Sequence, residues 1–185
     1  MRIISGKAGG ITLSVPKGEV RPTTDRVREA VFSILNPLMD QADVLDLFAG
    51  SGAFGPEAHS RRVDFSRLSC AAARANLVKT GLEGGTVIQG DAVQFVKREL
   101  LAGRKYDIIF ADPPYCKGPA DRDFIVELAE AGVAGLLKSG GVFIAEVQEG
   151  WGTGREGAAE IDGLNLVDTR RYGKNMLLFY QLPEK

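Results

Sequence analysis

From residue 43 onward, short apolar runs alternate with segments of helical periodicity. We expect strands at 43–48, 62–65, 86–89, 106–111 and 142–147, and helices between them at 53–61, 66–80, 91–102 and 121–137. Apolar strands that alternate with helices form a parallel sheet covered by those helices, because a parallel connection needs a long crossover. The pattern therefore predicts an α/β fold with a mostly parallel sheet.

The two ends of the chain depart from this alternation. The apolar runs 164–170 and 175–182 are joined by a short turn, which predicts an antiparallel hairpin. Residues 2–4 and 11–15 predict a small β-ribbon, and the apolar spacing over 24–38 predicts a helix. A seven-stranded, mostly parallel sheet that ends in an antiparallel hairpin is typical of Rossmann-like methyltransferases, whereas a dinucleotide-binding dehydrogenase continues with parallel strands.

The size and composition of the chain fit one compact domain. Its 185 residues are expected to form an amino-terminal extension at 1–40 and a catalytic core at 41–185. Two cysteines outside any metal-binding spacing and one histidine argue against a metal site. No apolar run reaches the roughly 20 residues of a membrane span, and the first residues lack the apolar core of a signal peptide. A monomeric, cytoplasmic protein without metal is expected.

Positive charge is concentrated at the amino-terminal end. The whole chain has a net charge of −1, but residues 1–28 carry +4 and the remainder carries −5. Such a segment can pair with the phosphates of a nucleic acid, although a solvated basic face explains it equally well.

The first motif is the run Asp46–Gly52 (DLFAGSG), at the end of the first expected strand. Glycine at 50 and 52 permits a tight turn and close approach of a ligand, because no β-carbon obstructs it. Gly50, Gly52 and Gly55 also fit the GxGxxG spacing of a dinucleotide site, so the glycines do not choose between nicotinamide and S-adenosylmethionine. The Asp46 carboxylate suits a cationic amino group or a sulfonium and opposes a pyrophosphate, which favours S-adenosylmethionine.

The second motif, Gly90-Asp91-Ala92, follows the expected strand at 86–89. The Asp91 carboxylate can accept a hydrogen bond from an adenine amino group. Taken by itself, a Gly-Asp pair after a strand is more often a turn and a helix cap. Its position relative to the first motif makes it a candidate cofactor contact.

The third motif, Asp112-Pro113-Pro114-Tyr115, follows the expected strand at 106–111. Two prolines fix φ and remove two backbone donors, so the carbonyls and the Asp112 carboxylate form an acceptor-only array that suits an NH2 group. The amino nitrogen of a nucleic-acid base is a poor nucleophile, and acceptors on its hydrogens stabilise the positive charge that develops during methyl transfer. Because Tyr115 can stack on an extruded base, the motif predicts methylation of an exocyclic amino group.

Together these motifs resemble those of the amino-group methyltransferases that use S-adenosylmethionine. A further run, Arg21–Phe32 (RPTTDRVREAVF), is similar to the signature of the bacterial 16S ribosomal RNA guanine-N2 methyltransferase family. The segments Met1–Lys7, Val15–Gly18 and Tyr172–Lys174 also resemble this family, so the resemblance spans nearly the whole chain. It implies methylation of the guanine 2-amino group in 16S ribosomal RNA, within or outside the small ribosomal subunit.

The resemblance implies roles for three groups of residues. The catalytic loop would consist of Asp112, Pro113, Pro114 and Tyr115. S-adenosylmethionine would be bound by Asp46, Phe48, Ala49, Gly50, Ser51, Gly52, Asp64, Asp91 and Ala92. RNA would be contacted by Arg2, Lys7, Arg21, Thr24, Arg26 and Arg28.

Two segments depart from the family pattern. In the family, the second strand is longer and ends in an acidic residue that binds the ribose hydroxyls, but here the segment 57–65 is shortened and Asp64 is the nearest candidate. The run Gly9–Ser14 lacks the lysines and arginines that are common there. RNA affinity is therefore expected to rest on Arg21, Arg26, Arg28, Arg61, Arg62, Arg170 and Arg171.

Four alternatives are weighed against this interpretation. A DNA adenine-N6 methyltransferase shares the chemistry of the Asp112 motif but usually adds a target-recognition domain. A protein-glutamine methyltransferase more often has asparagine before the two prolines. The shortened second strand keeps open a catalytically silent RNA-binding or assembly factor with the same fold. A nicotinamide enzyme gives no account of the Asp112 motif.

Overall fold

The structure is a computed structural model that describes residues 11–15, 41–52, 59–81, 84–116, 121–151 and 160–183. It divides into two compact units, Met1–Asp91 and Ala92–Lys185, each of which is described by itself. The expected strand at 2–4 and the expected helix at 24–38 lie outside the described residues, and so do the RNA contacts expected at Arg2, Lys7, Arg21, Thr24, Arg26 and Arg28.

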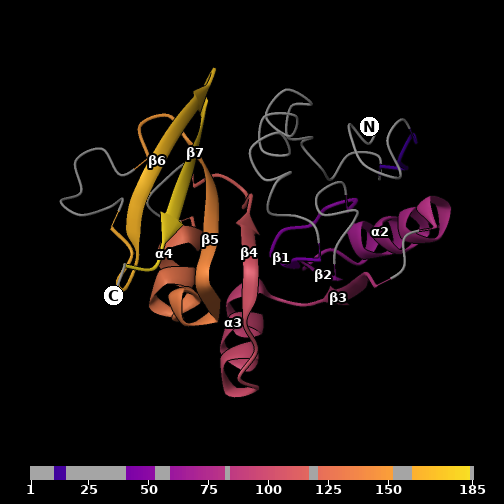
Figure 1. The fold of residues 1–185 in the computed structure, drawn as a ribbon. Coiled ribbons are helices and arrows are strands. Elements are labelled where there is room, and N and C mark those ends of the chain that lie inside the picture. Colours follow the sequence, from indigo (N-terminus) through magenta and orange to yellow (C-terminus); the bar gives the residue numbers. More distant parts are fainter. Residues whose placement is uncertain are drawn as a thin grey trace. The chain divides into compact units, whose positions relative to one another are not determined.

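The described residues of the first unit form three parallel strands and one helix (Figure 1). Strand β2 (His59–Asp64) lies between β1 (Asp43–Asp46) and β3 (Thr86–Gln89). Helix α2 (Arg67–Thr80) contacts β2 and β3, begins after the Ser66 cap and ends at Gly81, whose φ of 64° is left-handed. The predictions for this helix and for β3 are confirmed, and Ser66 and Gly81 are the signals that mark the helix ends.

The second strand is the main correction in this unit. A helix was predicted at 53–61 and a strand at 62–65, but β2 begins at His59 and pairs in parallel with β1 from Asp43 onward. Its run Ser60-Arg61-Arg62 is polar, which is unusual for a buried strand, yet the Arg62 side chain is only 1% exposed. The prediction was therefore wrong for residues 59–61, and the second strand has six residues rather than four.

The second unit contains four neighbouring strands, seen side by side in Figure 1 in the order β4, β5, β7, β6. Strand β4 (Tyr106–Ala111) is parallel to β5 (Leu137–Gln148), and β7 (Asn175–Gln181) is antiparallel to both β5 and β6 (Asn165–Tyr172). The helices of this unit are α3 (Ala92–Leu101) and α4 (Phe124–Glu130). The predicted α/β class, with seven mostly parallel strands and a terminal antiparallel hairpin, is confirmed.

The segment before β5 differs from the prediction. A helix was expected over 121–137, but α4 ends at Glu130 and a short 3₁₀ helix follows at Val133–Leu136. Gly132 lies between them with a φ of 87°, a left-handed conformation that interrupts an α-helix. Strand β5 then begins at Leu137, five residues before the predicted start at 142, and carries the buried ring of Phe143, which stacks on Tyr180 at 5.8 Å.

Candidate active site

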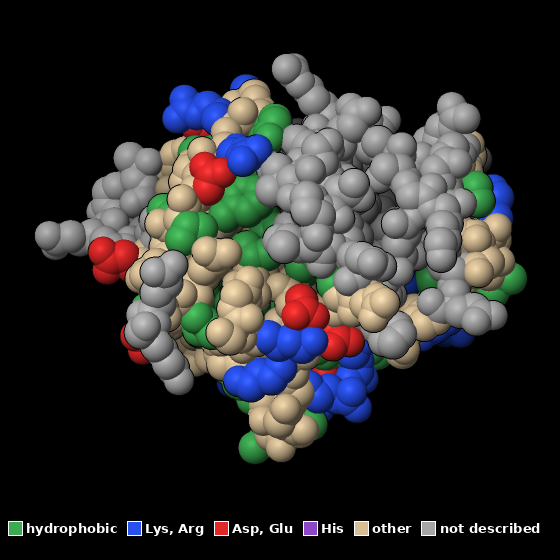
Figure 2. Space-filling model, viewed as in Figure 1, with side chains coloured by type: hydrophobic (Ala, Val, Ile, Leu, Met, Phe, Trp, Pro, Cys, Tyr) green, Lys and Arg blue, Asp and Glu red, His purple; other side chains and the backbone are tan. Residues whose placement is uncertain are grey.

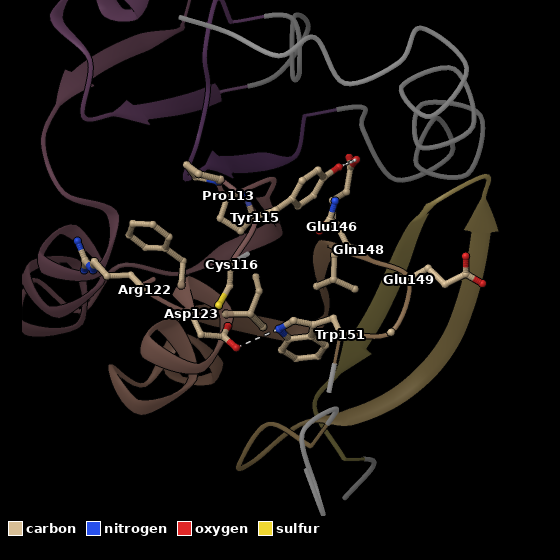
Figure 3. Close-up of a pocket in the computed structure, with 14 residues that line it drawn as sticks. Pro113, Tyr115, Cys116, Arg122, Asp123, Glu146, Gln148, Glu149 and Trp151 are labelled. Atoms are coloured by element: carbon tan, nitrogen blue, oxygen red, sulfur yellow. Dashed lines mark hydrogen bonds between the residues drawn. The ribbon is translucent and has the colours of Figure 1, made fainter. Parts of the chain in front are cut away.

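The loop Asp112–Tyr115, predicted from the sequence to be an array of hydrogen-bond acceptors and called the acceptor loop from here on, follows β4 directly. Ala111, the last residue of β4, is paired with Ala145 of β5, so Asp112 and Glu146 continue from neighbouring positions on adjacent strands. Together with the start of α4 and the turn after β5, the part of this loop after Asp112 lines a cavity of about 180 Å³ (Figure 3). The cavity is lined by Pro113, Pro114, Tyr115, Cys116, Arg122, Asp123, Phe124, Ile125, Glu146, Val147, Gln148, Glu149, Gly150 and Trp151.

Glu146 is a buried acid in this cavity wall, 1% exposed. Its Oε1 accepts hydrogen bonds from the Tyr115 hydroxyl at 3.3 Å and from Asn175 Nδ2 at 2.6 Å, and Tyr115 points toward it in Figure 3. Its Oε2 is also buried and has no hydrogen-bond partner among the described residues. Burial, and secondarily the negative charge of Asp112, raise the pKa of Glu146 to about 8. At neutral pH this acid is therefore mostly protonated.

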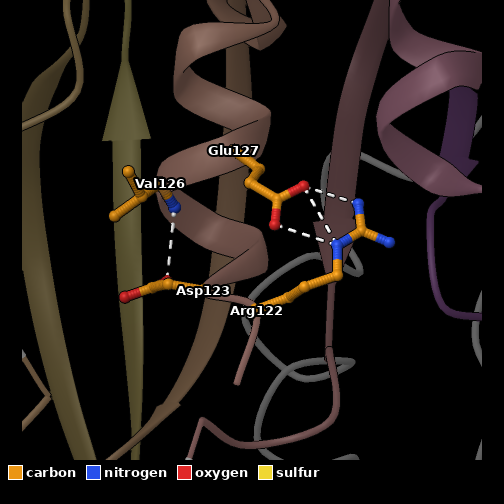
Figure 4. Close-up of polar contacts among 4 residues, drawn as sticks. All are labelled: Arg122, Asp123, Val126 and Glu127. Atoms are coloured by element: carbon orange, nitrogen blue, oxygen red, sulfur yellow. Dashed lines mark hydrogen bonds and ion pairs between the residues drawn. The ribbon is translucent and has the colours of Figure 1, made fainter. Parts of the chain in front are cut away.

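Trp151 and Asp123 form another wall of the cavity. Trp151 Nε1 donates to Asp123 Oδ2 at 3.1 Å, as the dashed line in Figure 3 shows. Asp123 Oδ1 accepts from the Val126 amide at 3.4 Å and caps α4 (Figure 4). Since Asp123 is fixed by the helix start, it holds the indole of Trp151 in place at the cavity.

Arg122 is oriented by a different set of contacts. Its Nε donates to both carboxylate oxygens of Glu127, at 2.9 and 3.2 Å, and Figure 4 shows the guanidinium directed toward that carboxylate. It also lies 4.3 Å from the centre of the Phe124 ring. The positive charge of Arg122 is thus offset by Glu127.

In the first unit, the glycine-rich run predicted to bind the cofactor forms a tight turn after β1. Gly50 and Gly52 have φ angles of 53° and 77°, which favour glycine. A β-carbon on Gly52 would lie 3.2 Å from the Ala73 β-carbon, so α2 approaches the turn closely. The Asp46 carboxylate is buried and accepts from the Phe48 amide at 3.3 Å, a contact that shapes the turn.

Asp64 connects this turn to the end of β2. One carboxylate oxygen accepts from the Gly50 amide and the other from the Ser66 amide, each at 2.8 Å. The Gly90 amide donates to the Asp64 carbonyl at 3.0 Å and brings the second motif to the same place. The structure therefore gathers the glycine turn, Asp64 and the Gly90 segment at the carboxyl ends of their strands. The cofactor roles of these residues, of half-buried Asp91 and of buried Ala92 stay predictions.

Asn76 anchors the glycine turn from α2. Its Nδ2 donates to the Ser51 carbonyl at 2.8 Å and to the Ser14 carbonyl at 2.9 Å, and its Oδ1 accepts from the Ser14 amide at 2.9 Å. The side chain is 3% exposed. One amide thus ties together α2, the turn and the described segment 11–15.

The arginines named as further RNA contacts differ in exposure. Arg62 is buried, where desolvation lowers its pKa and the negative charge of Asp46 on the neighbouring strand opposes that shift. Arg62 is therefore an interior residue of the first unit, and its assignment to RNA binding was wrong. Arg170 and Arg171 are exposed on β6 and pair with Asp168 and Glu149, at 2.8 and 2.9 Å.

A separate group of basic side chains gathers over α3 and the turn that leads to β4 (Figure 2). It consists of Lys97, Arg98, Arg104 and Lys105, all exposed. These residues lie toward the amino end of β4, whereas the acceptor loop follows its carboxyl end. They provide matched controls for charge changes in the expected RNA-binding segment.

Sequence reasoning missed Glu146, Asn175, Asp123 and Trp151. A signal for Glu146 was present, since it interrupts the apolar run of β5, whose neighbouring side chains are buried. No local signal marks Asn175, which reaches Glu146 through the pairing of β7 with β5. Among the described residues, no group of three or more His, Cys, Asp or Glu is placed to hold a metal ion. Likewise, no described helix is long and apolar enough to cross a membrane.

The fold agrees with the comparisons to known proteins. The model of the family described as Conserved hypothetical protein 95 matches residues 1–181, and the chain belongs to this family. A curated relative, the Ribosomal RNA small subunit methyltransferase D of Escherichia coli (strain K12), is 38% identical over 125 residues. That match spans 64% of this chain and 62% of the relative. The predicted resemblance to a small-subunit ribosomal RNA methyltransferase family is confirmed.

Solved structures agree over a longer part of the chain. A hypothetical protein of Thermus thermophilus is 27% identical with a TM-score of 0.77, and the match covers 98% of this chain and 99% of that one. A tRNA m1G37 methyltransferase of M. jannaschii is 15% identical with a TM-score of 0.65, over 89% of this chain and 52% of that one. At that identity, the second likeness shows the fold alone.

Proposed function

We propose that the protein transfers a methyl group from S-adenosylmethionine to the exocyclic 2-amino group of a guanine in 16S ribosomal RNA. The observation that carries this proposal is the acceptor loop Asp112–Tyr115, whose residues Pro113, Pro114 and Tyr115 line a cavity of about 180 Å³ with Glu146 and Trp151. The name of the curated relative supports ribosomal RNA as the substrate. The choice of guanine follows the resemblance of the run Arg21–Phe32.

The cavity suits one planar base. A cavity of about 150 Å³ is large enough for a benzene ring, so about 180 Å³ accommodates a flipped base at the open end. Tyr115 and Trp151 supply aromatic faces for stacking, which contributes about 1–3 kcal/mol for each base.

The loop can activate the amino group by electrostatics. The Asp112 carboxylate and the carbonyls of the loop can accept hydrogen bonds from the two N–H groups of the amino group. These acceptors place negative charge next to the nitrogen on which positive charge develops. The nitrogen would form a bond to the methyl carbon as the carbon–sulfur bond breaks and the sulfur leaves as a neutral thioether, and the methylated nitrogen would pass its extra proton to the Asp112 carboxylate or to water. Holding the reacting atoms in line is the main remaining contribution of the protein.

The turn in the first unit has the chemistry that S-adenosylmethionine requires. This cofactor supplies an electrophilic methyl group on a positively charged sulfur. A carboxylate has about four acceptor positions, so Asp64 can hold the turn and also bind ribose hydroxyls. A β-carbon at Gly52 would meet Ala73 and Arg62, so this position of the turn has no room for a side chain of its own. We assign cofactor binding to Asp46, Phe48, Ala49, Gly50, Ser51, Gly52, Asp64, Asp91 and Ala92.

The test of this function is transfer of labelled methyl from S-adenosylmethionine to small ribosomal subunits that lack the modification, followed by mapping of the labelled base. Label on the 2-amino group of one guanine supports the proposal. Label on an adenine N6 atom would replace guanine with adenine as the target. Tight RNA binding without cofactor binding at millimolar concentration would favour the silent assembly factor.

Binding of a base in the cavity is expected to quench the fluorescence of Trp151, the chain's single tryptophan. Because the indole lines the cavity, a stacked purine lies against the emitting ring. Titration with guanosine monophosphate should quench the emission more strongly than titration with cytidine monophosphate, which has a smaller stacking face. Equal, weak quenching by both nucleotides would contradict a base-binding role for this cavity.

Reversal of charge at Arg26 and Arg28 is expected to weaken RNA binding and to reduce its dependence on salt. Each lost phosphate contact lowers the slope of log affinity against log salt by about 1. Affinity should be measured over a series of salt concentrations, with Lys97→Glu and Arg98→Glu on α3 as the control pair. An unchanged slope in the Arg26→Glu, Arg28→Glu protein would exclude these contacts.

A further inference from the structure

Glu146 joins three parts of the second unit. It belongs to β5, accepts from Tyr115 of the acceptor loop and accepts from Asn175 at the start of β7. We propose that Glu146 is a positioning residue, which holds Tyr115 beside the cavity. Because Glu146 is an uncharged acid, it also places no second negative charge next to the Asp112 carboxylate. This inference rests on the proposed methyl transfer for its kinetic test.

The hydrogen bonds give the geometric part of the argument. Asn175 is the first residue of β7 and is paired with Gln148 of β5, so its position is set by the sheet. Its bond of 2.6 Å to Oε1 fixes the carboxyl, and the same oxygen receives the Tyr115 hydroxyl. The sheet therefore positions Asn175, Asn175 positions the Glu146 carboxyl, and that carboxyl positions the Tyr115 ring.

The buried second oxygen gives the electrostatic part. Oε1 accepts two hydrogen bonds, whereas Oε2 has no partner among the described residues, so the acid proton belongs on Oε2. The described groups that face Glu146 are Asp112 and Tyr115 from the loop and Asn175 from β7. Glu149, on the turn after β5, points away from it in Figure 3 and pairs with Arg171. Of the described groups that face Glu146, the charged one is thus the carboxylate of Asp112.

The direction of the pH effect follows from this pair. Burial and Asp112 raise the pKa of Glu146 to about 8, so the uncharged form is present below that pH and is lost as the pH rises through it. Ionisation then puts two negative charges on neighbouring strand ends, and their repulsion displaces the acceptor loop. We expect kcat/KM to fall above pH 8, by up to about tenfold for each further pH unit.

Two substitutions at Glu146 separate positioning from general stability. Glu146→Ala removes the support of Tyr115 and should lower kcat/KM by up to about a hundredfold at pH 7, the size of effect that a small misplacement produces. Glu146→Gln keeps an oxygen for both hydrogen bonds and never ionises. It should recover most of the activity lost in Glu146→Ala and show no alkaline fall. Glu130→Gln, exposed at the end of α4, is the control and should keep the wild-type profile.

Asn175→Ala provides a readout that a purely structural residue would not give. The hydrogen bond from Asn175 lowers the pKa of Glu146, so its loss should move the alkaline fall to higher pH. Carbon-13 NMR of labelled glutamate carboxyls should find one resonance, absent from Glu146→Gln, that titrates near pH 8 in the wild-type protein. Asn175→Ala should raise that midpoint.

The outcomes distinguish this inference from the proposed function. If the wild-type protein transfers no methyl group, the proposed function fails, while the NMR titration still tests the uncharged state of Glu146. If the wild-type protein is active and Glu146→Gln retains the alkaline fall, this inference alone is overturned. A Glu146 resonance that titrates in the ordinary range of glutamate, or activity that rises through pH 8, would also overturn it.

Discussion

Asp112→Ala is expected to reduce methyl transfer to background while S-adenosylmethionine still binds. The carboxylate is the charged member of the acceptor loop, and removal of one preorganised group at a developing charge lowers turnover by at least about 10²–10³-fold. The measurement is single-turnover transfer of labelled methyl to small ribosomal subunits, together with calorimetric titration of the cofactor. Because Asp112 contributes to the raised pKa of Glu146, the variant should also lower that pKa toward its usual range.

The control for this variant is Asp162→Ala, at an exposed position before β6. It removes the same side chain from the surface and should leave both turnover and cofactor affinity unchanged. Substantial turnover by Asp112→Ala would remove that residue from the reaction and, with it, the proposed mechanism.

Asn76→Ala is expected to destabilise the first unit and weaken cofactor binding together. The substitution leaves three backbone groups of Ser14 and Ser51 without the amide that binds them inside the protein. The expected loss in the free energy of unfolding is about 2–4 kcal/mol. Urea denaturation measures that loss, and calorimetric titration should show a parallel fall in the affinity for S-adenosylmethionine, because the glycine turn loses its anchor.

Asn165→Ala, exposed at the start of β6, is the matched control and should change neither quantity. If Asn76→Ala kept the wild-type urea midpoint, the three hydrogen bonds would contribute little to folding. A lowered midpoint with unchanged cofactor affinity would show that the anchor and the cofactor site are independent.

The fold could be predicted where local pattern and tertiary packing agree. Strand β4 was predicted closely because it is a short, almost wholly buried apolar run, and helix α2 because Ser66 and Gly81 mark its ends. Strand β2 was missed at its start because His59, Ser60 and Arg61 are polar, and their strand conformation follows from parallel pairing with β1, which a local pattern does not show.

The candidate site divides in the same way. The acceptor loop and the glycine turn carry strong local signals, since prolines and glycines restrict the backbone at particular positions. The residues that support them carry no such local signal. Asn76 forms hydrogen bonds with Ser14, 62 positions away in the sequence, and Asn175 forms one with Glu146, 29 positions away. Such contacts depend on strand pairing and helix packing, which the sequence pattern did not specify residue by residue.

The placement of β7 between β5 and β6 links the integrity of the site to local opening of the terminal hairpin. Strands β6 and β7 are joined by the turn at Gly173 and can form by local pairing before they dock on β5. When the hairpin undocks, Glu146 loses the amide donor that fixes its carboxyl beside Tyr115. The rate of amide hydrogen exchange in β7 would therefore report the fraction of molecules in which the hairpin is docked and the catalytic loop is assembled.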